Sequence, residues 1–166
     1  MPKPYHPLVL ANEFIACERD YGVSHMKLQK LVYCAHGWWL RSHYPDSIIN
    51  ESPEVWRHGP VFPTLYAVLS GLGGAQIKHT FPVVFGTEPP RIDDNDDEAY
   101  QLVQFVWGRY GSKSAFELSD MTHKPGTPWQ LTAEKYNYRI PKHTKIPSDL
   151  IRDEFSKIAA KSAEAA

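Results

Sequence analysis

The sequence has little cysteine: Cys17 and Cys34 are the two thiols among its 166 residues. Two cysteines are too few for a framework of disulfide bonds, and this scarcity is typical of a chain that stays reduced. No apolar run approaches the roughly 20 residues that a membrane-spanning helix needs, and no signal-peptide core follows the first residues. The sequence therefore predicts a cytoplasmic protein with no membrane partner.

The chain also lacks a strong excess of charge of either sign. Its 18 Lys and Arg against 19 Asp and Glu give a formal net charge of −1. A protein built around a polyanion usually carries a basic excess, so we do not expect nucleic acid as the primary partner. The basic, Tyr-containing stretch 135–145 can touch phosphates, although such a stretch is more often a solvated strap.

Motifs for catalysis and for metal or phosphate binding are missing as well. The sequence contains no GxSxG, HExxH or CxxC, and the glycines of 71–74 are not followed by the Lys-Ser/Thr of a phosphate loop. Its eight His show no ligand spacing, and both cysteines fall in apolar helical segments, where a free thiol usually packs as a small buried residue. We therefore predict a non-enzyme with no catalytic residue, no cofactor and no metal.

What the sequence has in excess is aromatic residues, at 13%, and proline, at 14 residues. Rigid rings and frequent chain breaks favour short elements. Apolar residues at helical spacing predict seven helices, beginning near residues 8, 24, 60 or 63, 93, 114, 127 and 148. We expect a mainly α fold, a compact orthogonal bundle of about six or seven short helices with little or no β-structure.

Local signals indicate where several of these helices begin. Ser24, Ser114 and Thr127 are predicted N-caps, and Pro128 occupies a first helical position. The acids of 93–98 suit the positive end of a helix dipole. Apolar residues surround most of the axis of the helix that these acids begin, so we expect it to be the central buried helix.

The helix from Ser24 has an apolar stripe from Leu28 to Trp39, which predicts its buried face. Lys27 and Lys30 lie one turn apart away from that stripe, where lysines are usually solvated. Gly37 costs about 1 kcal/mol relative to Ala inside a helix, which indicates that another part of the molecule packs closely there.

The segments between the helices carry weaker signals. Residues 47–58 are predicted to form a loop or a short edge strand, and Gly59-Pro60 is predicted to be a turn. A further short strand is expected over 80–85.

Three ordered blocks of sequence resemble the Panacea domain family, which includes the SocA-type antitoxins and the phage-associated GepA-like proteins. The resemblance covers about residues 8–135, so we predict a helical domain at 1–135. Residues 136–166 are predicted to be an extended segment and a C-terminal amphipathic helix, packed on the same domain or on a partner. The matching blocks are Lys27–Tyr33 with Gly37-Trp38, Trp56–Val61 with Leu65-Tyr66, and Leu118–His123 with Pro128-Trp129.

The resemblance implies the antitoxin of a toxin–antitoxin module, often carried on a prophage, which neutralises a cognate toxin by direct protein–protein binding. Many toxins of this family's modules inhibit translation. One branch instead acts as an adaptor that delivers its toxin to a AAA+ protease such as ClpXP. An enzyme using Cys34 or His123 is less favoured, and so is a DNA-binding regulator, because the sequence shows no helix-turn-helix signature. The sequence names neither the toxin nor an oligomeric state.

The matched polar and aromatic residues each have two interpretations. The tryptophans are either core aromatics or contact anchors, because Trp and Arg dominate interface hot spots. The arginine either braces a turn or binds the partner, the histidine either caps a helix or contacts the partner, and the lysines are either solvated or toxin-facing. The candidate partner-binding residues are Lys27, Lys30, Trp38, Trp56, Arg57, His123 and Trp129.

Overall fold

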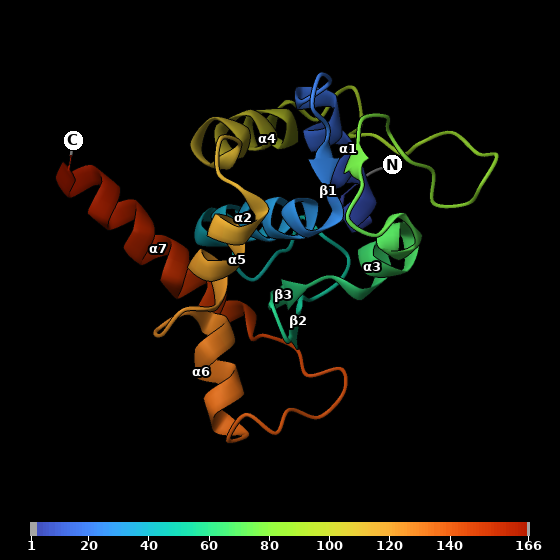
Figure 1. Cartoon of the computed structure of the whole chain (residues 1–166). Helices are drawn as coiled ribbons and strands as arrows, with labels where there is room; N and C mark the ends of the chain where they lie inside the picture. Colours follow the sequence, from blue (N-terminus) through green and yellow to red (C-terminus); the bar gives the residue numbers. More distant parts are fainter. Residues whose placement is uncertain (1–2, 166) are drawn as a thin grey trace.

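Helix α2 (His25–His43) lies at the centre of a computed structural model that describes residues 3–165 (Figure 1). Helices α1, α3, α4, α5 and α7 all contact it. The prediction of a mainly α fold with little β-structure is confirmed. The elements are α1 (Pro7–Cys17), β1 (Val23–Ser24), α2, β2 (Glu54–Trp56), β3 (Gly59–Val61), α3 (Pro63–Leu69), the 3₁₀ helix η1 (Ser70–Leu72), β4 (Gln76–Ile77), α4 (Asp97–Tyr110), α5 (Ala115–His123), α6 (Pro128–Lys135) and α7 (Ser148–Ala165).

The helix starts predicted from the caps Ser24, Ser114 and Thr127 agree with the structure, because each depends on a local hydrogen bond. The helix expected to begin near residue 93 begins at Asp97. The Ser24 and Ser114 hydroxyls accept from the backbone N–H groups of the third helical residues, at 3.3 and 3.1 Å. Thr127 does the same for α6, where Pro128 is the first helical residue. Asp96 caps α4. These bonds satisfy backbone donors that have no partner inside a helix.

The prediction that α4 is the central buried helix is wrong. Every residue of α2 from Leu28 to Leu40 is buried, whereas α4 buries four residues and leaves Phe105 47% exposed. The apolar residues of α4 surround its axis, but neighbouring elements cover one face of it. Helix α2 is covered on all sides, including the side that carries its polar residues.

The strands of the described chain form two short antiparallel pairs, and two isolated bridges join Tyr5 to Ile49 and Glu54 to Lys145. Strands β2 and β3 form a hairpin in which Trp56 pairs with Gly59, so the turn lies at 57–58 and the prediction of a turn at Gly59-Pro60 is wrong. Strand β1 pairs with β4. The strand expected over 80–85 is absent from this part of the chain, where the backbone N–H of Phe81 instead donates to the Asn12 side chain at 2.8 Å.

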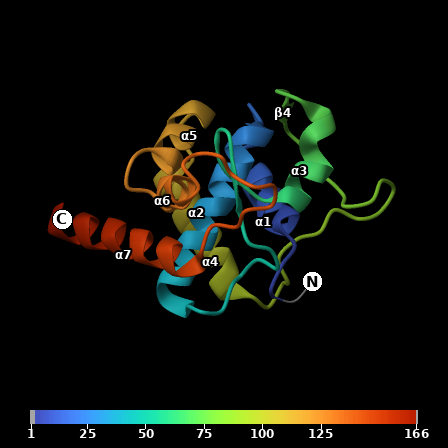
Figure 2. The same cartoon turned by 90° about the horizontal axis from the view of Figure 1, so that it is seen from below.

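Helix α7 packs on α2 and then extends outward (Figure 2). Its Ile151 and Phe155 are buried, and the ring of Phe155 lies directly over Gly37. A Cβ atom at Gly37 would lie 2.1 Å from Phe155 Cε2, so glycine is what allows this close approach. The division of the chain at residue 135 stays a prediction.

The two thiols lie at different depths. Cys34, in the middle of α2, is completely buried, and burial raises its pKa to about 12. Cys17, at the end of α1, is partly exposed, and burial raises its pKa as well. Among the helices of residues 3–165, none combines the length and the apolar character that crossing a membrane requires.

Candidate functional site

The β2–β3 hairpin gathers residues from all three sequence blocks into one group, the hairpin cluster, made of Lys30, Trp56, Ser119, His123 and Trp129. The indole N–H of Trp129 donates to the Trp56 carbonyl oxygen at 2.8 Å, and the Ser119 hydroxyl donates to the carbonyl of the turn at 2.7 Å. The His123 ring lies edge-on to Trp129, with 5.3 Å between ring centroids. Residues far apart in sequence thus fix the hairpin onto α5 and α6.

Lys30 lies beneath the hairpin and not in solvent, so its expected solvation is wrong. It is 2% exposed, and its Nζ donates to the Pro60 carbonyl oxygen at 2.8 Å. The hairpin covers the side of α2 that lies away from the apolar stripe. Gly59 makes this possible, because its φ of +112° suits glycine and a Cβ there would lie 3.0 Å from Lys30 Nζ.

Burial lowers the pKa of Lys30 from its ordinary value of 10.5 to about 7. Between these values the unfolded chain binds more protons than the folded chain, so stability rises with pH. We expect urea denaturation of the wild type to show this rise from pH 6.5 to 8.5, at no more than about 1.4 kcal/mol per pH unit. Lys30→Met should remove most of it, because the substitution keeps an unbranched side chain as far as the ε position and deletes the charged ammonium group.

The control for this experiment is Lys142→Met, because Lys142 is exposed. This variant should keep the wild-type rise. The range ends at pH 8.5 because unfolded Cys34 would ionise near its ordinary pKa of 9.0 while the folded thiol does not, which opposes the trend at higher pH. Equal slopes for wild type and Lys30→Met would contradict the assignment of a buried, titrating lysine.

The outer face of the hairpin presents residues to solvent. Arg57 is exposed at the turn, and Trp56 is half-buried against Tyr66, with 4.8 Å between ring centroids. Tyr66 is itself 43% exposed. An exposed Arg next to partly exposed aromatic rings has the composition of an interface anchor.

Lys27 and Trp38 lie apart from the hairpin cluster, and both connect α2 to α4. Lys27 Nζ donates to the Gly111 carbonyl oxygen at 2.6 Å, where a cation is favoured at the C-terminal end of a helix. The indole N–H of Trp38 donates to the Tyr110 hydroxyl at 3.0 Å. A partner-binding role for any of the seven candidate residues stays a prediction.

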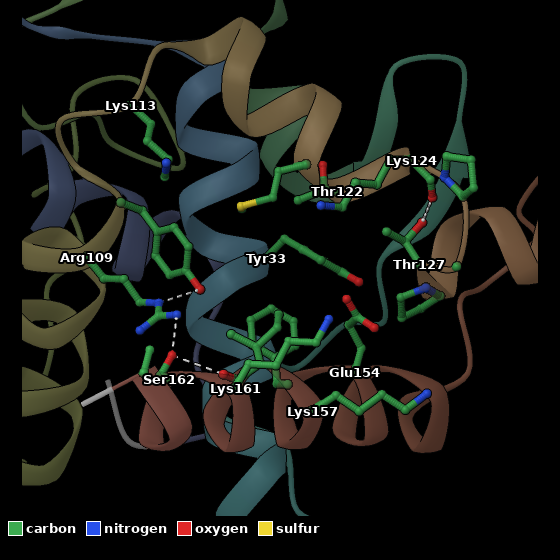
Figure 3. Close-up of a pocket in the computed structure, with 18 residues that line it drawn as sticks. Tyr33, Arg109, Lys113, Thr122, Lys124, Thr127, Glu154, Lys157, Lys161 and Ser162 are labelled. Carbon is green, nitrogen blue, oxygen red and sulfur yellow. Dashed lines mark hydrogen bonds between the residues drawn. The ribbon is translucent and has the colours of Figure 1, made fainter.

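A second site, the basic pocket, lies between α7 and the segments that follow α4 and α5 (Figure 3). Its volume is about 800 Å³. Phe155 and Ile158 of α7 and Met121 of α5 contribute apolar lining. The cationic residues that line it are Arg109, Lys113, Lys124, Lys157 and Lys161.

The cations of the basic pocket are little compensated within the protein. Glu154 supplies the one carboxylate among the lining residues. Within residues 3–165, no carboxylate oxygen lies within 4.0 Å of a charged nitrogen of the five cations. Arg109 instead donates to the Ser162 hydroxyl at 2.8 Å. The pocket is therefore strongly positive on a chain whose net charge is −1.

Tyr33 also lines the basic pocket and is 2% exposed (Figure 3). Its hydroxyl has no hydrogen-bond partner among the described residues, and burial raises its pKa well above the ordinary value. A buried hydroxyl without a partner costs about 1–3 kcal/mol. Such a group in a native protein calls for an explanation.

The sequence does not predict the basic pocket, because the cations that line it come from several separate segments. The one local signal is Lys157 and Lys161, which are spaced i, i+4 and therefore share a face of α7. The other cations of the pocket, Arg109, Lys113 and Lys124, show no helical spacing relative to this pair.

Nothing in the described chain assembles an obvious reactive centre. Between residues 3 and 165, no group of three or more His, Cys, Asp or Glu is placed to hold a metal ion. The Cys34 thiol is buried with a raised pKa, so it lacks the thiolate character of a nucleophile. The described fold is that of a small, mainly α-helical protein with two candidate sites.

Comparison with known proteins identifies the family. Residues 28–130 match the family described as Antitoxin SocA-like, Panacea domain, and the chain belongs to this family. Antitoxin SocA of Caulobacter vibrioides (strain NA1000 / CB15N) is 29% identical over 147 residues, which cover 84% of this chain and 76% of that protein. No solved structure matches the chain significantly. The resemblance inferred from the three sequence blocks is confirmed, and α7 lies outside the residues that the family model matches.

Proposed function

We propose that this chain is the antitoxin of a toxin–antitoxin pair and that it neutralises its toxin in the cytoplasm by direct protein–protein binding. The observation that carries this proposal is the family match over residues 28–130, together with the similarity to Antitoxin SocA. The exposed hairpin turn and the basic pocket supply surfaces suited to a protein partner. The toxin is proposed to be a translation inhibitor, encoded next to this gene.

Co-expression tests the proposal. The adjacent reading frame should stop growth when expressed alone, and this chain should restore growth. The two proteins should then copurify as a stable complex, and translation measured by amino-acid incorporation should recover. If no adjacent reading frame is toxic alone, the proposal is wrong.

The same strains distinguish blocking from delivery to a protease. Direct neutralisation predicts that the toxin keeps its half-life when this chain is present. A toxin half-life that shortens only when both this chain and a AAA+ protease such as ClpXP are present would instead identify a proteolytic adaptor.

We also propose that neutralisation needs no catalytic thiol. Cys34→Ala keeps a small apolar side chain at a buried position, so a folded variant should protect as well as the wild type. Loss of protection by a variant whose melting temperature is unchanged would contradict this.

A further inference from the structure

We propose that the basic pocket receives an acidic segment of the toxin, with the Tyr33 hydroxyl as a hydrogen-bond donor within the pocket. The proposal rests on the proposed function and specifies the chemistry of the partner at one site. It assigns a binding role to α7, whose C-terminal part extends outward from the rest of the molecule (Figure 2).

The charge of the basic pocket is largely uncompensated. The cavity is lined by Arg109, Lys113, Lys124, Lys157 and Lys161 and by one carboxylate. Like charges held close together repel one another, so an anion that enters the pocket lowers the electrostatic free energy of the protein. Complementary charge also speeds association and selects among partners.

The basic pocket mixes cations with accessible apolar surface. Ile158, Met121 and Pro125 line the same cavity as the cations, and each is at least partly exposed. A peptide that combines carboxylates with apolar side chains matches both parts of this lining, whereas a bare polyanion matches one. The volume of about 800 Å³ lies within the range of pockets that enclose a ligand and exceeds what a single ion fills.

The lining of the basic pocket disfavours nucleic acid as its ligand. Proteins that bind single strands stack bases on accessible aromatic faces. The aromatic residues that line this pocket are Tyr33, Tyr110 and Phe155, and each is at least 97% buried. They are therefore poor stacking platforms for bases. The overall charge of −1 also disfavours nucleic acid as a ligand.

The Tyr33 hydroxyl has no hydrogen-bond partner in the described chain. Within the described chain this group donates to no acceptor, although Glu154 lines the same pocket. A carboxylate offers acceptors only, so an acidic partner side chain suits a free O–H donor. The partner thus supplies what the free protein lacks.

Charge reversal tests the cationic lining. The probes are the purified toxin and a fluorescein-labelled decapeptide of alternating Glu and Leu, with a Gln-Leu peptide as its neutral counterpart. Wild-type chain should bind the toxin and the Glu-Leu peptide, with affinity that falls as salt rises from 50 to 300 mM, and should not bind the Gln-Leu peptide. Lys157→Glu with Lys161→Glu should weaken both interactions at least tenfold.

The matched control is Lys78→Glu with Lys142→Glu, which makes the same change in net charge at exposed residues outside the pocket. It should change either affinity less than twofold. Circular dichroism should show that both double variants keep the wild-type helix content.

Tyr33→Phe tests the hydroxyl and has a readout that a purely structural role would not give. Because the hydroxyl lacks a partner in the free chain, its removal should leave the melting temperature unchanged or raise it. Affinity for the toxin should nevertheless fall about tenfold, as expected for the loss of a hydrogen bond to a charged group. A lowered melting temperature with unchanged affinity would overturn this role.

The outcomes separate this proposal from the proposed function. If the wild type forms the toxin complex and the Lys157 and Lys161 double variant forms it equally well, the pocket proposal is overturned and the proposed function stands. If a labelled oligo-dT 12-mer binds more tightly than the peptide and is lost in that variant, the pocket binds nucleic acid and the proposal is overturned. If the wild type forms no toxin complex, both fail.

Discussion

Gly37→Ala should destabilise the fold by about 2–3 kcal/mol, because an added Cβ would overlap the ring of Phe155. The Cβ atom would lie 2.1 and 2.3 Å from two ring carbons, so α7 must shift away from α2. Urea denaturation followed by far-ultraviolet circular dichroism measures the loss. The near-ultraviolet signal of the neighbouring aromatic residues should weaken as well.

Gly108→Ala is the matched control, because it makes the same substitution inside α4 with no atom within 4 Å of the new Cβ. It should raise stability by about 0.5–1 kcal/mol, the usual advantage of Ala over Gly in a helix. Phe155→Ala alone should cost about 3–5 kcal/mol, and adding Gly37→Ala to it should cost little more. If Gly37→Ala and Gly108→Ala have the same effect, the close packing of α7 on α2 is refuted.

Acidification from pH 6.5 to 4 should destabilise the chain by about 3 kcal/mol through His36. Burial lowers the pKa of His36 from 6.5 to about 4. As pH falls through this range, the unfolded chain takes up a proton that the folded chain excludes, so stability is lost. The ring is 1% exposed, and its Nε2 has no hydrogen-bond partner among the described residues.

Urea denaturation between pH 6.5 and 4 measures this loss, and His36→Gln should flatten the slope. His6 and His25, whose pKa values burial also lowers, act in the same direction and leave a smaller residual slope. The exposed His79→Gln is the control and should keep the wild-type slope. A His36→Gln slope as steep as that of the wild type would rule out His36 as the source.

The sequence predicts the helix starts well and the burial of the helices less well, for a physical reason. A cap such as Ser114 is a bond between residues three apart, so the sequence contains all of it. Burial depends on what covers each face, and no local pattern shows that a hairpin covers Lys30 while α4 leaves Phe105 partly exposed. Gly59 illustrates the same limit, because its glycine reflects the approach of Lys30 as well as its own φ of +112°.

The two candidate sites also differ in how far the sequence predicts them. The hairpin cluster is largely predictable, since its members belong to blocks that a family resemblance already marks. The basic pocket depends on α4, α5 and α7 meeting in space, and its charges are single residues in the sequence. Proximity in the fold creates the site.

Because Cys17 and Cys34 lie at different depths, the rates at which their thiols are labelled can measure how often the fold opens. A thiol reagent reaches partly exposed Cys17 through small local motions, but reaches Cys34 only when the shell around α2 opens. The labelling rate of Cys34 therefore follows the population of the open state when closing is fast. A partner that binds only the folded chain slows this rate by the factor 1 + [L]/Kd, where [L] is the free partner concentration, so the affinity of the partner can be measured without an attached dye.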